Sequence, residues 1–205
     1  MDFKKHIETA WKLTMRFIAP LIIMTLVFSV ICFFTLGILG LVTLAGYFQS
    51  VLLMVREGRE PRVQDLFSEM RLFFPLLGFQ VVVFLAIFVG FLMLVLPGIL
   101  IAIAAGYFCL YMLPLMTDKK LSLLDAVRES FRLTTEGQIV DHVVVFILFV
   151  GISAIGGSVF IAWLFTQPLA TVFLMSVYND FKKATPGNIQ PPGPQAPEAG
   201  HEEAP

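Results

Sequence analysis

Charged residues are scarce in this sequence, and three long segments contain none. Asp, Glu, Lys and Arg make up 14% of the 205 residues, whereas soluble domains carry about a quarter. Phe17–Val55, Leu72–Met116 and His142–Asn179 are uncharged over 39, 45 and 38 residues, and 58% of the whole chain is hydrophobic. Uncharged apolar runs longer than about 18 residues are typical of membrane spans. The composition therefore excludes an ordinary soluble domain and predicts an all-α, polytopic membrane protein.

The residue types that catalysis and metal binding require are also few. His6, His142 and His201 are scattered and have no carboxylates at ligand spacing, and the sequence contains no Gly-rich phosphate loop, HExxH or CxxC motif. Cys32 and Cys109 lie in apolar segments at different predicted depths, so we expect packing residues rather than a disulfide. We expect no enzyme activity, no catalytic residue, no metal site and no cofactor.

Each uncharged segment is long enough for two membrane spans. Drawn as single helices the segments would extend about 57 to 68 Å, whereas about 20 residues cross the ~30 Å hydrocarbon core. Turn-forming residues lie near their midpoints: Gly37 and Gly40, then Pro97-Gly98, then Gly151 and Gly156-Gly157. A kink at Pro97 is the alternative, but one span would then carry a large surplus of residues. We predict six transmembrane helices in three helical hairpins, at about 14–36, 39–56, 74–96, 98–117, 139–156 and 159–180.

The distribution of positive charge predicts the orientation of these helices. All 14 lysines and arginines lie at the ends of the uncharged segments or between them, and none lies at a predicted mid-segment turn. With six spans, both termini and both charged loops share one side, which the positive-inside rule assigns to the cytoplasm. We therefore expect a multi-pass domain over residues 1–183. Residues 184–205 are Pro-rich and predict a disordered cytoplasmic tail.

Short amphipathic segments precede the spans. Apolar residues follow helical spacing from Phe3 to Ile18 and in residues 61–74, and Ser122–Asp125 resembles a capping box before a third such segment. We expect short cytoplasmic helices with apolar faces toward lipid and basic residues toward anionic phospholipid headgroups. The alternative is that they only lead into the spans behind them. The candidate headgroup contacts are Arg56, Arg59, Arg62, Arg71, Lys119 and Lys120.

Internal similarity suggests that one unit is used three times. MRFIAPL begins at Met15 and MRLFFPL at Met70, an offset of 55 residues, and FRLTTEG from Phe131 is a weaker third copy. Gly46-Tyr47-Phe48 likewise recurs as Gly106-Tyr107-Phe108. The predicted unit is an amphipathic segment followed by a helical hairpin, and a chance match between Phe-rich segments is the alternative. All copies would start from the same side, as parallel repeats do.

Polar residues within the predicted spans are the remaining candidates for a site. No ionisable group lies at mid-membrane depth in the predicted topology, and the deepest large polar side chains are Gln49, Gln80 and Gln167. Intramembrane glutamines either form structural hydrogen bonds between helices or line a site for a transported molecule. The sequence leaves both interpretations open.

The second half of the chain carries a family resemblance. The segments are LPGILIA, MLPLMTDKK, LLDAVRESFRLTTEG and QPLATVFLMSVYNDF. Their order is similar to that in uncharacterised bacterial integral membrane proteins related to the membrane domain fused to some glycerophosphodiester phosphodiesterases. The matching family features are Leu96-Pro97-Gly98, Pro114, Asp125-Ala126 with Ser130, and Tyr178. The resemblance implies a fold and a location in the bacterial inner membrane. It implies no phosphodiesterase activity, which belongs to a separate soluble domain.

These observations favour a non-enzymatic membrane module with an accessory, scaffolding or lipid-organising role. Its expected partners are the bilayer and anionic headgroups, with no nucleic acid and with protein partners left open. The alternative is a passive transporter, channel or lipid-handling protein whose site lies between the spans. A polar cavity shared by the three glutamines would favour the alternative.

The six-span topology predicts which positions are reachable from outside the cell. Single cysteines placed near Gly37, Gly98 and Gly157 should react with a membrane-impermeant thiol reagent in intact cells, because these residues lie in the predicted outer turns. A cysteine near Arg59 should react only after the membrane is permeabilised. Labelling of the Arg59 position in intact cells would contradict the topology.

Overall fold

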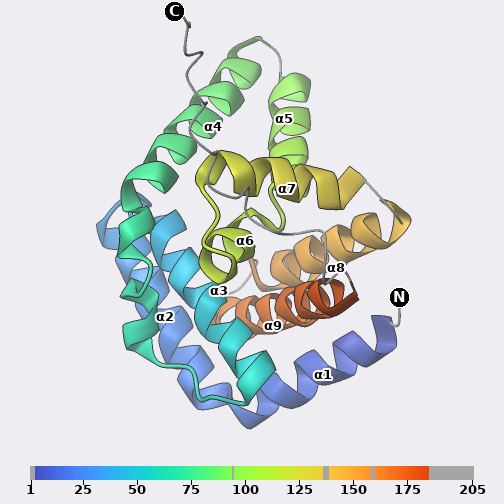
Figure 1. The fold of residues 1–205 in the computed structure, drawn as a ribbon. Coiled ribbons are helices and arrows are strands. Elements are labelled where there is room, and N and C mark those ends of the chain that lie inside the picture. The colour runs from blue at the N-terminus through green and yellow to red at the C-terminus, as the bar shows by residue number, and fades with distance from the viewer. Residues whose placement is uncertain (1–2, 94, 136–138, 158–159, 185–205) are drawn as a thin grey trace, which may run out of the picture.

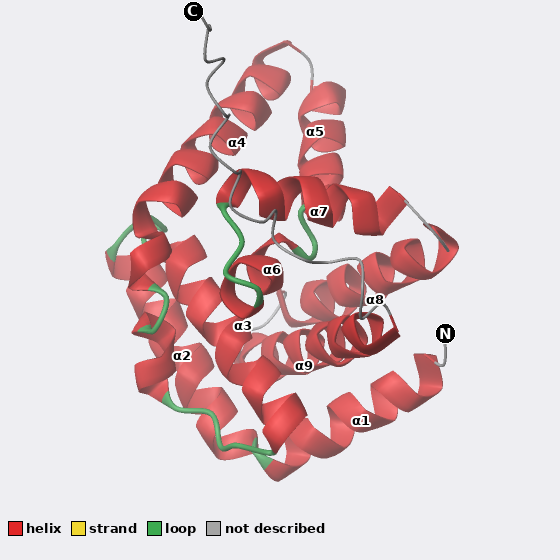
Figure 2. Ribbon diagram, viewed as in Figure 1, coloured by secondary structure: helices red, strands yellow, loops and turns green. Residues whose placement is uncertain are grey.

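The described part of the chain is helical throughout. The computed structural model describes residues 3–93, 95–135, 139–157 and 160–184, and no strand occurs among them (Figures 1 and 2). The predicted tail, 184–205, lies outside the described residues except for Ala184. The helices are α1 Phe3–Arg16, α2 Ile18–Phe34, α3 Gly40–Glu57, η1 Val63–Phe67, η2 Met70–Leu72, α4 Phe73–Met93, α5 Val95–Phe108, α6 Met112–Asp118, α7 Leu123–Thr135, α8 Ile139–Gly157 and α9 Phe160–Ala184.

Four of the long helices, α3, α4, α8 and α9, begin within one residue of a predicted span. Two helical stretches, Val63–Leu92 and Val95–Asp118, are long and apolar enough to cross a membrane. Two sharply bent pairs, α1 with α2 and α7 with residues 139–154, raise the number to as many as four if each pair is one span. The described helices thus define two to four candidate spans, fewer than the six that segment length predicts.

Large apolar side chains are exposed along the helices that form these candidate spans. On α4, Val82 and Leu92 are 65% and 71% exposed, and on α5 Leu96 is 70% exposed. In Figure 1, α4 and α5 project side by side from the rest of the molecule. Exposed apolar surface on this scale marks a contact with lipid or with another protein.

The centre of the molecule is formed by α3 and α9. Nine consecutive residues of α9, Thr171–Asn179, are buried on every side, which is the property of a helix enclosed by others. In α3, Tyr47 is 1% exposed and its hydroxyl lies 3.0 Å from that of Thr25 on α2. The two central helices contact each other, and α1, α2 and α8 pack against α9.

The amphipathic N-terminal segment forms α1, which packs on α9 instead of only leading into the next helix. The chain bends by 87° between α1 and α2. The buried side of α1 consists of His6, Ala10 and Thr14, and His6 Nδ1 lies 2.9 Å from Ser176 Oγ on α9. Trp11 is 51% exposed, as part of an apolar stripe with Ile7 and Met15. The predicted apolar face is therefore divided between the protein interior and the surface.

The second amphipathic helix, α7, stabilises a break in the chain. The predicted span 98–117 is divided into α5 and α6 by residues 109–111, which frees backbone groups from helical hydrogen bonds. Ser130 Oγ accepts a hydrogen bond from Tyr111 N at 3.2 Å and donates one to Phe108 O at 2.6 Å. The predicted start of α7 is also observed, because Asp125 N donates to Ser122 Oγ at 3.3 Å.

The segment 61–74 is not the amphipathic α-helix that its periodicity predicts. It forms two 3-10 turns, η1 and η2, which continue into α4. Asp65 in η1 accepts a hydrogen bond from Ser50 Oγ at 2.7 Å and pairs with Arg59. These contacts hold η1 against the side of α3, and they join residues far apart in sequence, which a periodicity argument cannot detect.

Two close backbone approaches depend on glycine. Pro97 and Gly98 lie in the first turn of α5, which begins at Val95, and not in the turn before it as the sequence predicts. Gly98 packs against α4, where a Cβ atom at Gly90 would lie 2.9 Å from Gly98 Cα. A Cβ atom at Gly46 would lie 2.5 Å from Leu66 O, so Gly46 allows the backbone of η1 to contact α3. Small residues serve the same purpose in other membrane helix contacts.

Replacement of Gly46 by alanine should destabilise the protein by about 1–3 kcal/mol, because the backbone of η1 must move away from α3. Gly78→Ala in α4 is the matched control, since a Cβ there has no neighbour within 4 Å, and helix propensity favours alanine by about 0.5–1 kcal/mol. Thermal unfolding of both variants in detergent checks the difference. Equal unfolding midpoints would contradict the observed contact between η1 and α3.

Candidate functional site

A buried carboxylate joins the ends of three helices. Asp118, the last residue of α6, has a side chain only 7% exposed. It accepts hydrogen bonds from both terminal nitrogens of Arg56 on α3, from Lys182 Nζ at 2.8 Å and from the Tyr178 hydroxyl at 3.2 Å, both on α9. Arg56 Nε donates to Asn179 Oδ1 at 2.8 Å. A buried carboxylate needs such partners, because removal of a charge from water is costly.

The helix ends explain why cations gather here. Arg56 lies in the last turn of α3, which stops at Gly58 with φ 68°, and Lys182 lies near the end of α9. The C-terminal end of a helix carries partial negative charge and favours nearby cations. Asp118 adds a full negative charge between Arg56 and Lys182. These two side chains reach it from the ends of α3 and α9.

A pocket of about 420 Å³ lies beside this cluster. Its lining consists of Val55, Arg56, Asn179 and Lys182, and we call it the headgroup-side pocket. Arg56 and Lys182 keep further N–H groups beyond those bonded to Asp118. The Arg56 and Lys182 side chains therefore retain hydrogen-bond donors that suit an anion.

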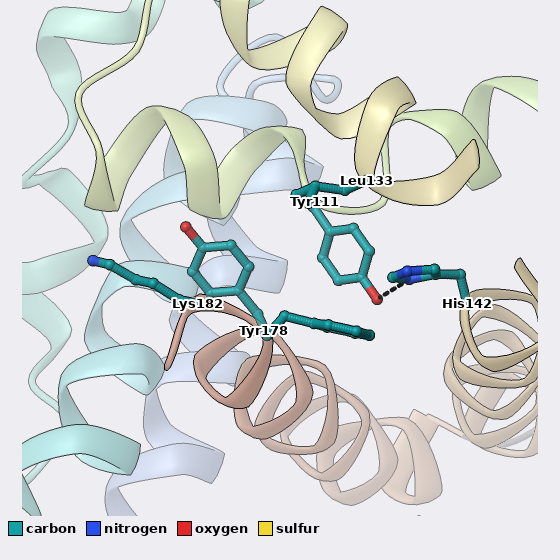
Figure 3. A pocket seen from close by; sticks show the side chains of 6 residues that line it. Tyr111, Leu133, His142, Tyr178 and Lys182 are labelled. Carbon is teal, nitrogen blue, oxygen red and sulfur yellow. Dashed lines mark hydrogen bonds between the residues drawn. The ribbon is translucent and has the colours of Figure 1, made fainter. Parts of the chain in front are cut away.

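A second polar contact lies on the other side of Tyr178. The Tyr111 hydroxyl is 3.2 Å from His142 Nδ1 (Figure 3). The ring of Phe181 stacks on His142 with centroids 4.6 Å apart. These residues and Leu133 enclose a space of about 10 Å³, which is at most the room for one water molecule. We interpret this cluster as packing that orients Tyr111 and Tyr178.

The predicted headgroup contacts do not form one surface cluster. Arg56 belongs to the Asp118 site, Arg59 pairs with Asp65, and Arg71 pairs with Glu69 at 3.0 Å. Burial lowers the pKa of Lys119 to about 8, although the Glu129 carboxylate favours its charged form. The other two predicted contacts, Arg62 and Lys120, are exposed.

Gln80, one of the three predicted intramembrane glutamines, lines a large cavity. The cavity measures about 470 Å³ and is otherwise apolar; it is lined by Phe28, Gly37, Gly40, Leu41, Leu44, Phe79, Gln80, Val83, Phe84, Ile87, Ala102, Ala105 and Gly106. Gln80 Nε2 donates to Gly37 O at 3.0 Å, while Gln80 Oε1 is buried without a partner. The cavity thus offers one acceptor within an apolar surface.

The other two glutamines lie elsewhere. Gln49 on α3 has a buried Oε1 without a hydrogen-bond partner, and Gln167 on α9 does not line the Gln80 cavity. Neither of them lines the cavity that Gln80 lines. Each of them has to be considered separately.

Sequence reasoning named Arg56 but missed Asp118, Asn179 and Lys182 as parts of one site. A signal for them exists, because Arg56, Asp118 and Asn179 each lie within two residues of the end of an uncharged segment. Ends that share one side of a membrane can meet there. Which side chains pair across helices still depends on how the helices pack.

Comparison with known proteins finds no match among family models, curated proteins or solved structures. Among the described residues, no group of three or more His, Cys, Asp or Glu side chains could hold a metal ion. The site is accordingly interpreted from its own geometry.

A double-mutant cycle should show that the Arg56–Asp118 pair is energetically coupled. With Arg56→Gln and Asp118→Asn, we expect a coupling free energy of about 2 kcal/mol in detergent unfolding, because the two side chains are largely withdrawn from solvent. The Arg71–Glu69 pair, in which the Arg71 side chain is 48% exposed, is the control and should couple by less than about 1 kcal/mol. Equal coupling free energies in the two pairs would mean that the Arg56–Asp118 pair stabilises the fold no more than the control pair does.

Proposed function

We propose that this chain is a non-enzymatic integral protein of the bacterial cytoplasmic membrane with an accessory, scaffolding or lipid-organising role. The proposal rests on one observation: exposed apolar side chains and charged side chains lie on different parts of the molecule. Apolar side chains are exposed along α4 and α5, while Arg56, Asp118 and Lys182 gather where helices end. Such a molecule fits a bilayer, with its apolar surface in contact with acyl chains and its cations near anionic headgroups.

We further propose six spans in three hairpins, with both termini in the cytoplasm. The proposal is supported by long helices in all three uncharged segments and by the contacts of α4 with α5 and of α8 with α9, which are neighbours in sequence. The proposed repeat has support in its first and third copies, α1 and α7, which both bury small or polar residues at every fourth position and both precede a sharp bend. The second copy, residues 61–74, forms 3-10 turns instead. The family resemblance of residues 96–181 is compatible with this arrangement and stays part of the proposal.

The second candidate function is passive handling of a lipid or another apolar molecule. The Gln80 cavity supports it, because about 470 Å³ of mostly apolar space with one unpaired acceptor is typical of small-molecule sites. We rank it second because Gln49 and Gln167 do not line this cavity.

The leading proposal is tested by the lipid that accompanies the protein. When the chain is extracted with its surrounding lipid in polymer-bounded nanodiscs, anionic phospholipids should be enriched on the order of twofold or more over the bulk membrane. Replacement of the exposed cations Arg62 and Lys120 by glutamine should reduce the enrichment. Lipid of bulk composition around the unmodified chain would count against a lipid-organising role.

The second candidate is tested in proteoliposomes that contain a fluorescent phospholipid. Our leading proposal predicts no faster movement of this lipid between leaflets than in protein-free vesicles, measured by quenching from outside. Faster movement that is lost in Gln80→Leu but kept in Gln49→Leu would place lipid handling first.

A further inference from the structure

We infer that the headgroup-side pocket is a stereochemically defined site for the phosphate group of an anionic phospholipid. The inference rests on the proposal that the chain lies in a membrane, and it goes further by naming the ligand group and its binding residues. These are Arg56, Asn179 and Lys182, with Asp118 behind them as the group that holds them in place.

The side chains at this pocket have hydrogen-bond donors that are not used within the described part of the protein. Arg56 has five N–H groups and uses one on each of its three nitrogens to bond Asp118 and Asn179, while Lys182 uses one of its three N–H groups. Asn179 accepts through Oδ1, and its side-chain N–H₂ group donates to no described residue. Every acceptor on these side chains is thus engaged, whereas donors from three side chains remain, and a phosphate offers the acceptors that they lack.

The charge of the pocket also suits a phosphodiester. Arg56 and Lys182 carry two positive charges, and Asp118 neutralises one of them. Beyond these three, Glu57 is the exposed last residue of α3 and Lys119 follows Asp118, so these two charges offset each other. Asp180 and Lys183 on α9, which adjoin Asn179 and Lys182, offset each other in the same way. A net charge of about +1 remains, which matches the single negative charge of a phospholipid phosphodiester.

The two cations are held in place before any ligand arrives. Asp118 binds the end of Arg56 through two nitrogens and Asn179 binds its Nε, so the guanidinium plane is fixed. Binding then costs little additional side-chain entropy. Arg62 and Lys120, by contrast, are exposed and contribute only to the general positive field.

The position of the pocket favours a lipid over a soluble anion. Its volume of about 420 Å³ lies within the range of small-molecule sites and has room for a headgroup. Val55, the last residue of the first uncharged segment, supplies an apolar wall beside the donors. A site with hydrogen-bond donors next to an apolar side chain is expected where lipid headgroups meet acyl chains.

The test replaces Asn179 by aspartate. Asn179→Asp keeps an oxygen for Arg56 Nε but turns the donor group into an anion, so phosphate binding should weaken at least about tenfold. Gln64→Glu, the same amide-to-carboxylate change at an exposed position of η1, is the matched control and should change affinity by less than about twofold. Native mass spectrometry of the full chain in neutral detergent, titrated with phosphatidylglycerol, measures both.

A second variant keeps the test decisive if Asn179→Asp does not fold. Lys182→Gln leaves the Arg56–Asp118 pair intact and should give a similar loss, whereas Lys12→Gln, at an exposed position of α1, should not. Equal losses of affinity in the pocket and control variants would mean that binding depends only on the overall positive charge, and this would overturn the inference. Unchanged binding in both pocket variants would overturn it as well.

Titration with inorganic phosphate separates the two sources of the ligand group. We expect binding at least about tenfold weaker than that of phosphatidylglycerol, and equal affinity would overturn the lipid assignment. This inference and the proposed function can fail separately. If anionic lipid is enriched in nanodiscs but the pocket variants keep their affinity for phosphatidylglycerol, only the pocket is refuted. Pocket binding without any enrichment would refute only the lipid-organising role.

Discussion

The Asp118 carboxylate is the interaction on which the meeting of α3, α6 and α9 depends. It is nearly inaccessible to solvent, yet it is bound by Arg56 from α3 and by Tyr178 and Lys182 from α9. An uncompensated carboxylate in such a place would cost several kcal/mol, so the ends of three helices have to converge on it. The headgroup-side pocket follows directly, because the same convergence leaves two oriented cations at its edge.

Away from this site, small and hydroxyl residues define how the helices approach one another. In a chain this apolar, contact with lipid and contact with another helix are similar in energy, so hydrophobicity alone selects no arrangement. Gly46 admits the backbone of η1, and Ser130 pairs the backbone groups freed between α5 and α6. The hydrogen bonds of Ser130 are a structural reason for a serine at this position.

Local signals in the sequence predicted much of the fold. The beginnings of α3, α4, α8 and α9 follow from the uncharged segments and their Gly and Pro residues, and the N-cap of α7 follows from Ser122. Periodicity failed at residues 61–74, where Asp65 bonds to Ser50 and Arg59 in place of a regular helix. The site was predicted only in part, since Arg56 was recognised by its charge whereas Asp118 and Lys182 are recognised by their contacts.

The amino-acid sequence by itself determined the helical class, the approximate ends of the long helices and the confinement of charge to segment ends. These properties depend on neighbouring residues, on segment length and on the cost of an unpaired backbone group in an apolar environment. Only the tertiary structure decided that Arg56, Asp118 and Lys182 share one site and that Gln80 faces a cavity apart from Gln49 and Gln167. Those relations depend on the packing of helices with similar apolar surfaces, where a few glycines and hydrogen bonds select one arrangement among many.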